Sequence, residues 1–191
     1  KTPDYRISAK YEGDGDEIEW RVDDPYRHLP TIGELDLHLI REGRHEELWT
    51  ALGSHITSVQ TGSSTSTGTK FAVWAPNAQA VRVVGDFNHW NGTAHSMRVM
   101  GASGVWEIFI PGIGSGTKYK YEILTKAGHW ITKIDPLARA TEVPPSTASI
   151  VAESSYQWKD SAWLDHRASR DALKSPMSIY ELHAGSWRLG L

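Results

Sequence analysis

The residues best suited to chemistry in this sequence lie in one short motif, Asp86-Phe87-Asn88-His89-Trp90. The indole of Trp90 offers a flat apolar face that can stack on the C–H groups of a pyranose ring. The side-chain amide of Asn88 can donate to and accept from sugar hydroxyls. An aromatic ring beside an amide at the edge of a loop therefore suits carbohydrate binding. The alternative is that Trp90 covers the hydrophobic core, because aromatic side chains belong to the core more often than to a binding site.

Two expected strands position this motif. Apolar residues alternate with others over residues 70–75, and the alternation returns over residues 81–85. A period of two is typical of β-strands. Pro76 and Asn77 interrupt the pattern, as turn residues do. Residues 69–90 are therefore predicted to be two strands joined by a turn, with the aromatic motif at the end of the second strand.

Further short strands are expected at residues 55–59, 105–110, 117–124, 131–134 and 148–152. Turn residues separate them, among them Asn91-Gly92 and Pro111-Gly112. The intervals are too short for crossover helices, which argues against a parallel sheet. The pattern predicts a mainly β fold, an immunoglobulin-like β-sandwich. Residues 60–68 are small, polar and rich in Gly, Ser and Thr, and they are expected to form a flexible loop.

The region before the sandwich combines strand and helix signals. Residues 5–11 and 18–22 alternate on either side of a turn cluster, which predicts a hairpin or two neighbouring strands. Thr31 stands three residues before Glu34, the spacing of a capping box, and the next residues fit either a short helix or an extended segment. Residues 46–52 favour a helix.

Composition narrows the classes of function. The 191 residues carry a formal net charge of −3 without a basic stripe, so nucleic acid is not an expected partner. No cysteine is present, which excludes disulfides and thiolate metal sites and fits a cytoplasmic location. No apolar run approaches a membrane span and no signal peptide opens the chain, so a membrane is not expected as a partner either. Nine Trp against three Phe suit polysaccharide binding, but equally suit β-sandwich cores and domain interfaces.

The histidines do not suggest a metal site. His38 and His45 would need two further donors on a consistent face, and neither donor is evident in the sequence. Both are expected to be surface or packing residues, and no metal or other cofactor is expected.

Four sequence strings point to a family: FAVWAPNA at 71–78, VVGDFNHW at 83–90, GVWEIFIPG at 104–112 and YKYEI at 119–123. In order and spacing they resemble the N-terminal carbohydrate-binding module, family 48, of bacterial 1,4-α-glucan branching enzymes. The resemblance is closest over residues 69–152, and it implies that residues 54–155 form such a module. It extends more weakly to both ends of the chain.

The resemblance also implies where sugar would bind. In this family the glucan site consists of an aromatic residue after the F-N turn, a lysine on the Y-K-(F/Y) strand and an aromatic residue on the next turn. Those motifs fall on Trp90, Lys120 and Trp130, and Asn88 is a candidate for a further hydrogen bond. The rings would stack on glucose units and the ammonium would donate to hydroxyl oxygens. The alternative is that the module packs on a catalytic barrel and that these residues serve the interface or the core.

Both flanks of the module resemble parts of the same enzymes. Residues 30–53 resemble the close of the first N-terminal domain of actinobacterial-type enzymes, so residues 1–53 are expected to be the C-terminal part of that β domain plus a helical connector. Residues 156–176 are expected to be a linker. The string IYELHAGSW at 179–187 resembles the first barrel strand of the α-amylase superfamily (glycoside hydrolase family 13), so residues 177–191 are expected to begin a truncated (β/α)₈ barrel.

The resemblance implies a parent protein that is a glycogen branching enzyme, a retaining glycosyltransferase that cleaves α-1,4-glucan and transfers the cut chain to form α-1,6 branches. This region would bind or position α-1,4-glucan, raising its effective concentration, or brace the enzyme's own catalytic barrel. Two alternatives stay open: a free-standing glucan-binding or regulatory module, and an accessory region of another superfamily member such as a debranching enzyme or trehalohydrolase. The barrel-strand string argues against the first alternative, and residues 30–53 argue against the second.

The 191 residues alone are expected to be catalytically inactive. The family's Asp nucleophile, Glu acid/base and second Asp lie on later barrel strands, and none of them is in this chain. A (β/α)₈ barrel needs roughly 250 residues. Incubating the purified chain with amylose should therefore produce no α-1,6 branches, and detectable glucan transfer would contradict this expectation.

Overall fold

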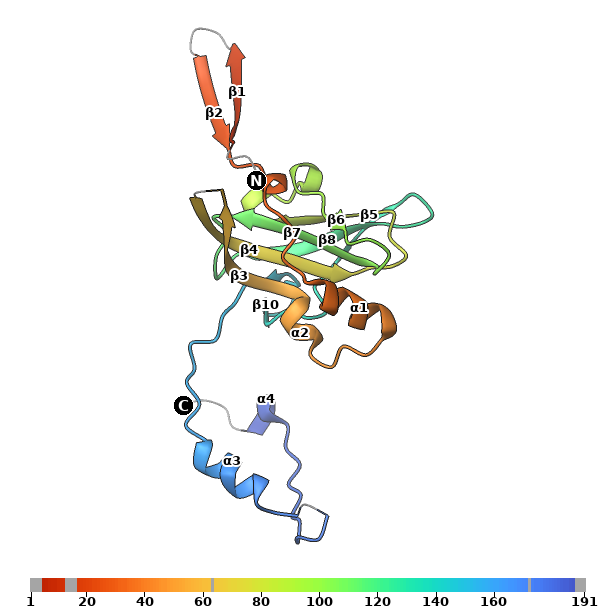
Figure 1. Ribbon diagram of the computed structural model, residues 1–191, viewed down its shortest axis with the longest axis vertical. Helices are drawn as coiled ribbons and strands as arrows, with labels where there is room; N and C mark the ends of the chain where they lie inside the picture. The colour runs from red at the N-terminus through yellow and green to blue at the C-terminus, as the bar shows by residue number, and fades with distance from the viewer. Residues whose placement is uncertain (1–4, 13–16, 63, 172, 188–191) are drawn as a thin grey trace. The chain divides into compact units, whose positions relative to one another are not determined.

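The computed structural model describes residues 5–12, 17–62, 64–171 and 173–187 (Figure 1). The chain divides into two compact units, one up to Ser154 and one from Ser155 onwards, and each is described by itself. Within the described ranges, every helix is too short or too polar to span a bilayer.

Two antiparallel sheets form the body of the first unit (Figure 1). One contains, in spatial order, β3 (Gly53–Thr61), β4 (Ser64–Trp74), β7 (Val105–Pro111) and β6 (Arg98–Val99). The other contains β10 (Ala140–Thr141), β11 (Ser149–Ile150), β8 (Lys118–Leu124) and β5 (Ala80–Gly85), with β9 (Trp130–Lys133) also paired to β8. The mainly β fold predicted from the spacing is confirmed, and strands occur at each of the expected positions.

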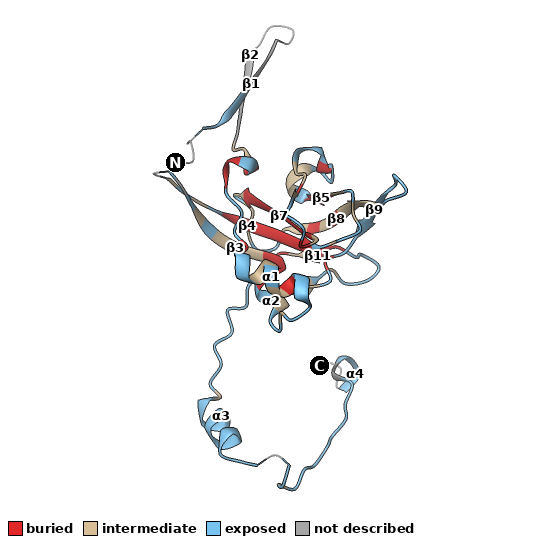
Figure 2. Ribbon diagram, turned by 45° about the vertical axis from the view of Figure 1, so that its right-hand side comes forward, coloured by how far each residue is buried: buried red, intermediate tan, exposed pale blue. Residues whose placement is uncertain are grey.

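The inner faces of the two sheets share one hydrophobic core, which Figure 2 shows as buried stretches of β4 and β7. Alternate residues of each strand contribute to it, because successive side chains of a strand face opposite sides. The buried core residues are Phe71, Val73, Val81, Val83, Met97, Trp106, Ile108, Ile110, Tyr119, Tyr121 and Val151. Removing this apolar surface from water is the main contribution to the stability of the unit.

A buried carboxylate joins this core to the loop after β9. Asp135 is 3% exposed and accepts hydrogen bonds from the hydroxyls of Tyr119 at 2.6 Å and Tyr121 at 3.3 Å. Its other oxygen accepts from the backbone N–H of Leu137 at 2.8 Å. Burial raises the pKa of the Asp135 carboxyl, and burial next to this carboxylate raises the pKa of both tyrosine hydroxyls. The three side chains therefore satisfy one another's hydrogen bonds in an apolar setting.

The chain before the sandwich packs on the outer side of the four-stranded sheet. This segment contains η1 (Pro25–Arg27), α1 (Glu34–Glu42) and α2 (Leu48–Ala51), and Figure 1 shows both α-helices beside β3. The ring of His28 packs edge-on against Phe109, with ring centroids 4.8 Å apart. A second apolar cluster joins the segment to the sheet, made of Ile32, Ile40, Ala51, Leu52, Ala72 and Val105. The segment is thus continuous with the sandwich, and the domain boundary predicted after residue 53 stays a prediction.

Two helix predictions before the sandwich need correction. The N-cap of α1 is Gly33 and not Thr31. The backbone N–H of Thr31 instead donates to the buried carboxylate of Glu107 on β7 at 2.8 Å. A capping box would have needed this N–H to bond to Glu34, so the contact with the sheet replaces the predicted cap. The helix expected over residues 46–52 is confined to α2, because Leu52 already has an extended backbone that leads into β3.

The flexible loop expected at residues 60–68 is instead the end of a long hairpin. β3 and β4 stay paired up to Thr61 and Ser64. The hydroxyl oxygens of Ser58 and Thr67 lie 2.8 Å apart across the hairpin. Because β-branched threonine suits a pleated strand, pairing with the neighbouring strand outweighs the loop-like composition.

The N-terminal hairpin predicted from the alternation is confirmed. It consists of β1 (Ile7–Glu12) and β2 (Glu17–Val22), which pair antiparallel. Among the strands that the structure describes, neither pairs with any other. A two-stranded hairpin is marginally stable by itself in water, so this one is expected to depend on neighbouring chain or on a further domain.

The second unit contains two short helices, α3 (Ser161–Ala168) and α4 (Ala184–Trp187). Residues 177–183 pair with no strand in the described part of the chain, so the predicted barrel strand stays a prediction. A first barrel strand would find its hydrogen-bonded neighbours in later strands of the barrel. The large apolar side chains exposed in this unit are Tyr156, Trp158, Trp163, Leu164, Leu173, Met177, Ile179, Tyr180, Leu182 and Trp187.

Replacing Asp135 with Ala should destabilise the first unit, because the buried hydroxyl of Tyr119 would lose its acceptor and that of Tyr121 would keep only the carbonyl of Ala72 at 3.5 Å. An unsatisfied buried polar group costs about 1–3 kcal/mol, so we expect the free energy of unfolding to fall by about 3 kcal/mol in urea denaturation. Asp86→Ala is the matched control, since Asp86 is exposed and accepts one 3.2 Å hydrogen bond from the backbone of Lys118. Equal losses in the two variants would contradict the role assigned to Asp135.

Candidate functional site

Strand pairing gathers the outward side chains of β5, β8 and β9 on one side of the five-stranded sheet. On β8, Tyr119 and Tyr121 point into the core, so the residues that alternate with them point outward. Directly opposed residues of neighbouring strands share a face of the sheet. The outward pairs are Arg82 with Glu122, Val84 with Lys120, and Trp130 with Leu124. Val84 is buried, so we name the surface formed by the other five residues the outer face.

A tight turn places Trp90 beside the Gly85 end of β5. The chain passes from Gly85 through η2 (Asp86–Asn88) and η3 (Gly92–Ala94). His89 and Trp90 have positive φ angles of 51° and 60°, and the N–H of Trp90 donates to the carbonyl of Gly85 at 3.0 Å. Positive φ is uncommon for residues other than glycine, so neighbouring contacts must hold this turn. The indole of Trp90 is 41% exposed.

The amide of Asn88 is one of those contacts. Its oxygen accepts from the N–H of Gly85 at 2.9 Å, and its NH₂ group donates to the carbonyl of Val83 and to Nδ1 of His95, each at 3.0 Å. Burial lowers the pKa of the His95 imidazole, which favours the neutral ring whose Nδ1 can accept. Both amide protons of Asn88 are thus engaged in positioning Trp90. A sugar hydroxyl could reach only the remaining lone pair of the Asn88 oxygen.

Lys120 and Trp130 both reach the surface of the outer face. Nζ of Lys120 donates to Oγ1 of Thr147 at 2.8 Å, which leaves further N–H donors of the ammonium for a ligand. The indole of Trp130 is 40% exposed. Lys120 and Leu124, the residue opposite Trp130, are separated by about 13 Å along β8 at about 3.3 Å per residue. The face is therefore long enough for more than one contact with a chain-like ligand.

Arg82, which no family motif marks, lies over the ring of Trp130. The guanidinium carbon is 4.1 Å from the ring centroid, within the range of a cation–π contact. Alternation along β5 could have placed Arg82 outward, but the ring it meets depends on the register of three strands. Because the guanidinium covers one face of the indole, a ligand can stack only on the other face of Trp130.

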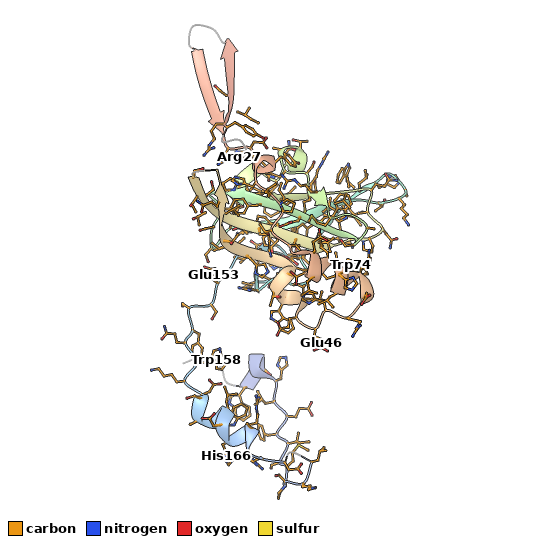
Figure 3. The ribbon with its side chains drawn as sticks, in the orientation of Figure 1. Arg27, Glu46, Trp74, Glu153, Trp158 and His166 are labelled. Carbon is orange, nitrogen blue, oxygen red and sulfur yellow. The ribbon has the colours of Figure 1, made fainter. Side chains whose placement is uncertain are left out.

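An apolar pocket of about 410 Å³ lies on the other sheet, and Figure 3 shows Trp74 of this pocket beside α1. Its lining residues are Ile40, Gly43, His45, Leu48, Leu52, Ala72, Val73, Trp74, Asp135, Pro136 and Leu137. Nε1 of Trp74 donates to the carbonyl of Ser103 at 3.2 Å, and Nε2 of His45 lies 3.0 Å from a carboxylate oxygen of Asp36. With these polar groups already paired, the pocket suits an apolar group better than a sugar. Within the described ranges, no three His, Asp or Glu side chains gather in a way that could hold a metal ion.

Residues 51–138 match the family described as carbohydrate-binding module 48 (isoamylase N-terminal domain). Among similar curated proteins, the 1,4-alpha-glucan branching enzyme GlgB of Leifsonia xyli subsp. xyli is 58% identical over 96% of this chain. The GlgB of Thermobifida fusca is 58% identical over 100% of it. The alignments cover 24% and 25% of those proteins, so the chain spans about a quarter of the length of these relatives.

Similar solved structures include pullulanase type I from Bacillus subtilis complexed with maltose, which aligns with a TM-score of 0.44 and 23% identity over 56% of this chain and 14% of that one. The maltotriose complex of PulA from Klebsiella pneumoniae aligns with a TM-score of 0.42 and 27% identity over 53% of this chain and 11% of that one. At these scores the likeness carries no inference about function.

Acidification should weaken the turn that holds Trp90. Because burial lowers the pKa of His95 below its unfolded value of about 6.5, the unfolded chain gains a proton that the folded chain resists. Stability from this group is therefore complete above about pH 6.5 and is lost as the pH falls below it. Between about pH 7.5 and about pH 5.5, the free energy of unfolding should fall more for the wild type than for His95→Gln in urea denaturation.

His28 and His55 also have pKa values lowered by burial. Both therefore contribute to the fall in the free energy of unfolding on acidification, in the wild type and in His95→Gln alike. The difference between wild type and His95→Gln therefore isolates His95. His129 is exposed in the loop before β9, so His129→Gln is the matched control for exchanging a histidine outside this turn. An identical fall in wild type and His95→Gln would contradict the role of His95 in this turn.

Proposed function

We propose that this chain is the N-terminal accessory region of a GlgB-type branching enzyme and that residues 51–138 form its family 48 carbohydrate-binding module. The similarity to actinobacterial GlgB enzymes over nearly the whole chain, and the match of residues 51–138 to that module family, support this proposal. The whole enzyme would cut α-1,4-glucan in the cytoplasm and transfer the cut chain to form α-1,6 branches, using carboxylates outside these 191 residues. The names of these relatives favour this proposal over a debranching enzyme, a trehalohydrolase or a free-standing regulatory module.

The outer face is the surface that binds α-1,4-glucan in this proposal. The observation that carries it is that Lys120 and Trp130, which are distant in sequence, lie on one side of the five-stranded sheet, and that the turn carrying Trp90 is bonded to the Gly85 end of β5 in the same sheet. The rings would stack on glucose units, and the ammonium would donate to hydroxyl oxygens. Asn88 would act by holding the turn of Trp90 rather than by donating to sugar.

Glucan binding at this face would serve the enzyme as a tether. A substrate held by one module meets the active site at a raised effective concentration, without any new contact at the reacting bond. Two stacking contacts and one hydrogen bond give weak binding once the loss of ligand freedom is subtracted. Weak binding suits a module that must let the glucan move after each transfer.

The second unit would contribute to the interface with the catalytic barrel of the same protein. Three of its apolar side chains, Trp158, Leu173 and Ile179, are 77%, 97% and 83% exposed. Apolar side chains exposed in such number indicate an interaction surface. The resemblance of residues 179–187 to a first barrel strand supports a barrel as the partner.

Electrophoresis in a native gel that contains glycogen should retard the wild-type chain, because the outer face would bind the polymer. Trp90→Ala and Trp130→Ala should each lose most of the retardation, since each removes a stacking surface. Lys120→Met should lose part of it, because one hydrogen bond to a charged donor contributes less than a buried ring. Urea denaturation of each variant would first establish that it is folded.

The matched control is Trp158→Ala, which removes an exposed tryptophan from the second unit and should migrate like the wild type. A wild-type chain that migrates equally with and without glycogen would overturn glucan binding at the outer face. The tryptophans would then belong to the core or to the barrel interface.

A further inference from the structure

The stem of Arg82 is held in place from two sides. Arg82 lies opposite Glu122 in the ladder between β5 and β8. The turn around Gly92 lies directly against both residues: a Cβ atom at Gly92 would lie 2.8 Å from Cβ of Arg82 and 2.9 Å from Oε2 of Glu122. Only glycine allows so close an approach of backbone to side chain. The direction of the Arg82 side chain is therefore set before any ligand arrives.

The head of Arg82 is positioned but its hydrogen-bond donors are unused. The guanidinium lies over the indole of Trp130 at 4.1 Å, although Glu122 is its directly opposed neighbour on β8. In the described part of the chain, the Arg82 side chain makes no hydrogen bond or ion pair, whereas the guanidinium of Arg98 donates to the carbonyl of Tyr26 at 2.6 Å. Five N–H donors of Arg82 are thus left to solvent or to a ligand.

We propose that Arg82 is a second hydroxyl-binding residue of the outer face besides Lys120, with its guanidinium donating two N–H bonds to the 2- and 3-hydroxyl oxygens of one glucose unit. This inference rests on the proposed glucan binding. In an α-1,4-glucan the 2- and 3-hydroxyls are the vicinal pair that every unit keeps free of the chain linkage. The planar fork of a guanidinium matches two neighbouring oxygen acceptors, which the single point of an ammonium does not.

Trp130 has a second role in this arrangement. Contact with the indole restrains the guanidinium, so less rotational freedom is lost when the two hydrogen bonds form. Trp130 therefore positions Arg82 with one face of its ring and offers the other face to sugar. Lys120 lies further along β8 and would meet a different glucose unit.

The test compares maltoheptaose with 2-deoxy-maltoheptaose, which lacks one oxygen of each vicinal pair. Isothermal titration of the whole chain should show that the wild type prefers maltoheptaose by about tenfold, since a hydrogen bond from a charged donor contributes a factor of that order. Arg82→Met keeps the stem under Gly92 and removes the donors. It should bind maltoheptaose about tenfold more weakly and lose most of the wild-type preference, with the Lys120 ammonium accounting for what remains.

Two further variants separate this role from a general effect of charge or folding. Arg82→Lys keeps the charge but not the fork, and its preference for maltoheptaose should fall well below that of the wild type. Arg167 lies over the ring of Trp163 at 4.9 Å in the second unit, so Arg167→Met removes the same kind of stack elsewhere and should retain wild-type affinity and preference.

The outcomes distinguish this inference from the proposed function. If the wild type binds maltoheptaose and Arg82→Met keeps the wild-type preference, the inference is overturned while glucan binding stands. This holds even if Arg82→Met binds more weakly, because a weaker affinity with the full wild-type preference would mean that Arg82 only supports the fold. If the wild type binds neither sugar, both the inference and glucan binding at the outer face are overturned.

Discussion

The pairing of β8 with its neighbours is the constraint on which the rest of the first unit depends. This strand is bonded to β5 along one edge and to β9 and β11 along the other. Because side chains alternate, the register that buries Tyr119 and Tyr121 also turns Lys120 and Glu122 outward. A slip of one residue would bring charged groups into the core and leave the buried carboxylate of Asp135 without its two hydroxyl donors.

The candidate site is held rigid by that sheet and by two local contacts in the segment after β5. The amide of Asn88 closes the turn that carries Trp90, and the missing side chain of Gly92 lets the same segment hold the stem of Arg82. Both contacts are present before a ligand binds, so a sugar would meet side chains that have already lost much of their conformational freedom. The same strand that completes the core thus supplies the framework of the outer face.

The sandwich could be predicted because alternation and turn residues are local signals, and the strands at 105–110 and 117–124 follow them closely. Predictions failed where a residue distant in the sequence determines the local structure. The backbone of Thr31 bonds to Glu107, far along the chain, and not to its own helix. At the site, motifs could mark Trp90, Lys120 and Trp130. The hydrogen bonds of Asn88 depend on the shape of its turn, and the ring that Arg82 meets depends on strand register, and neither is contained in a local pattern.

The central claim is that one side of the five-stranded sheet binds α-1,4-glucan. The most direct measurement is a titration of the ¹⁵N-labelled chain with maltoheptaose, followed by amide chemical shifts. The account predicts that shifts concentrate in β5, the turn through Trp90, the outward positions of β8, and β9 around Trp130. Shifts confined to the pocket around Trp74, or an unchanged spectrum at millimolar sugar, would contradict it.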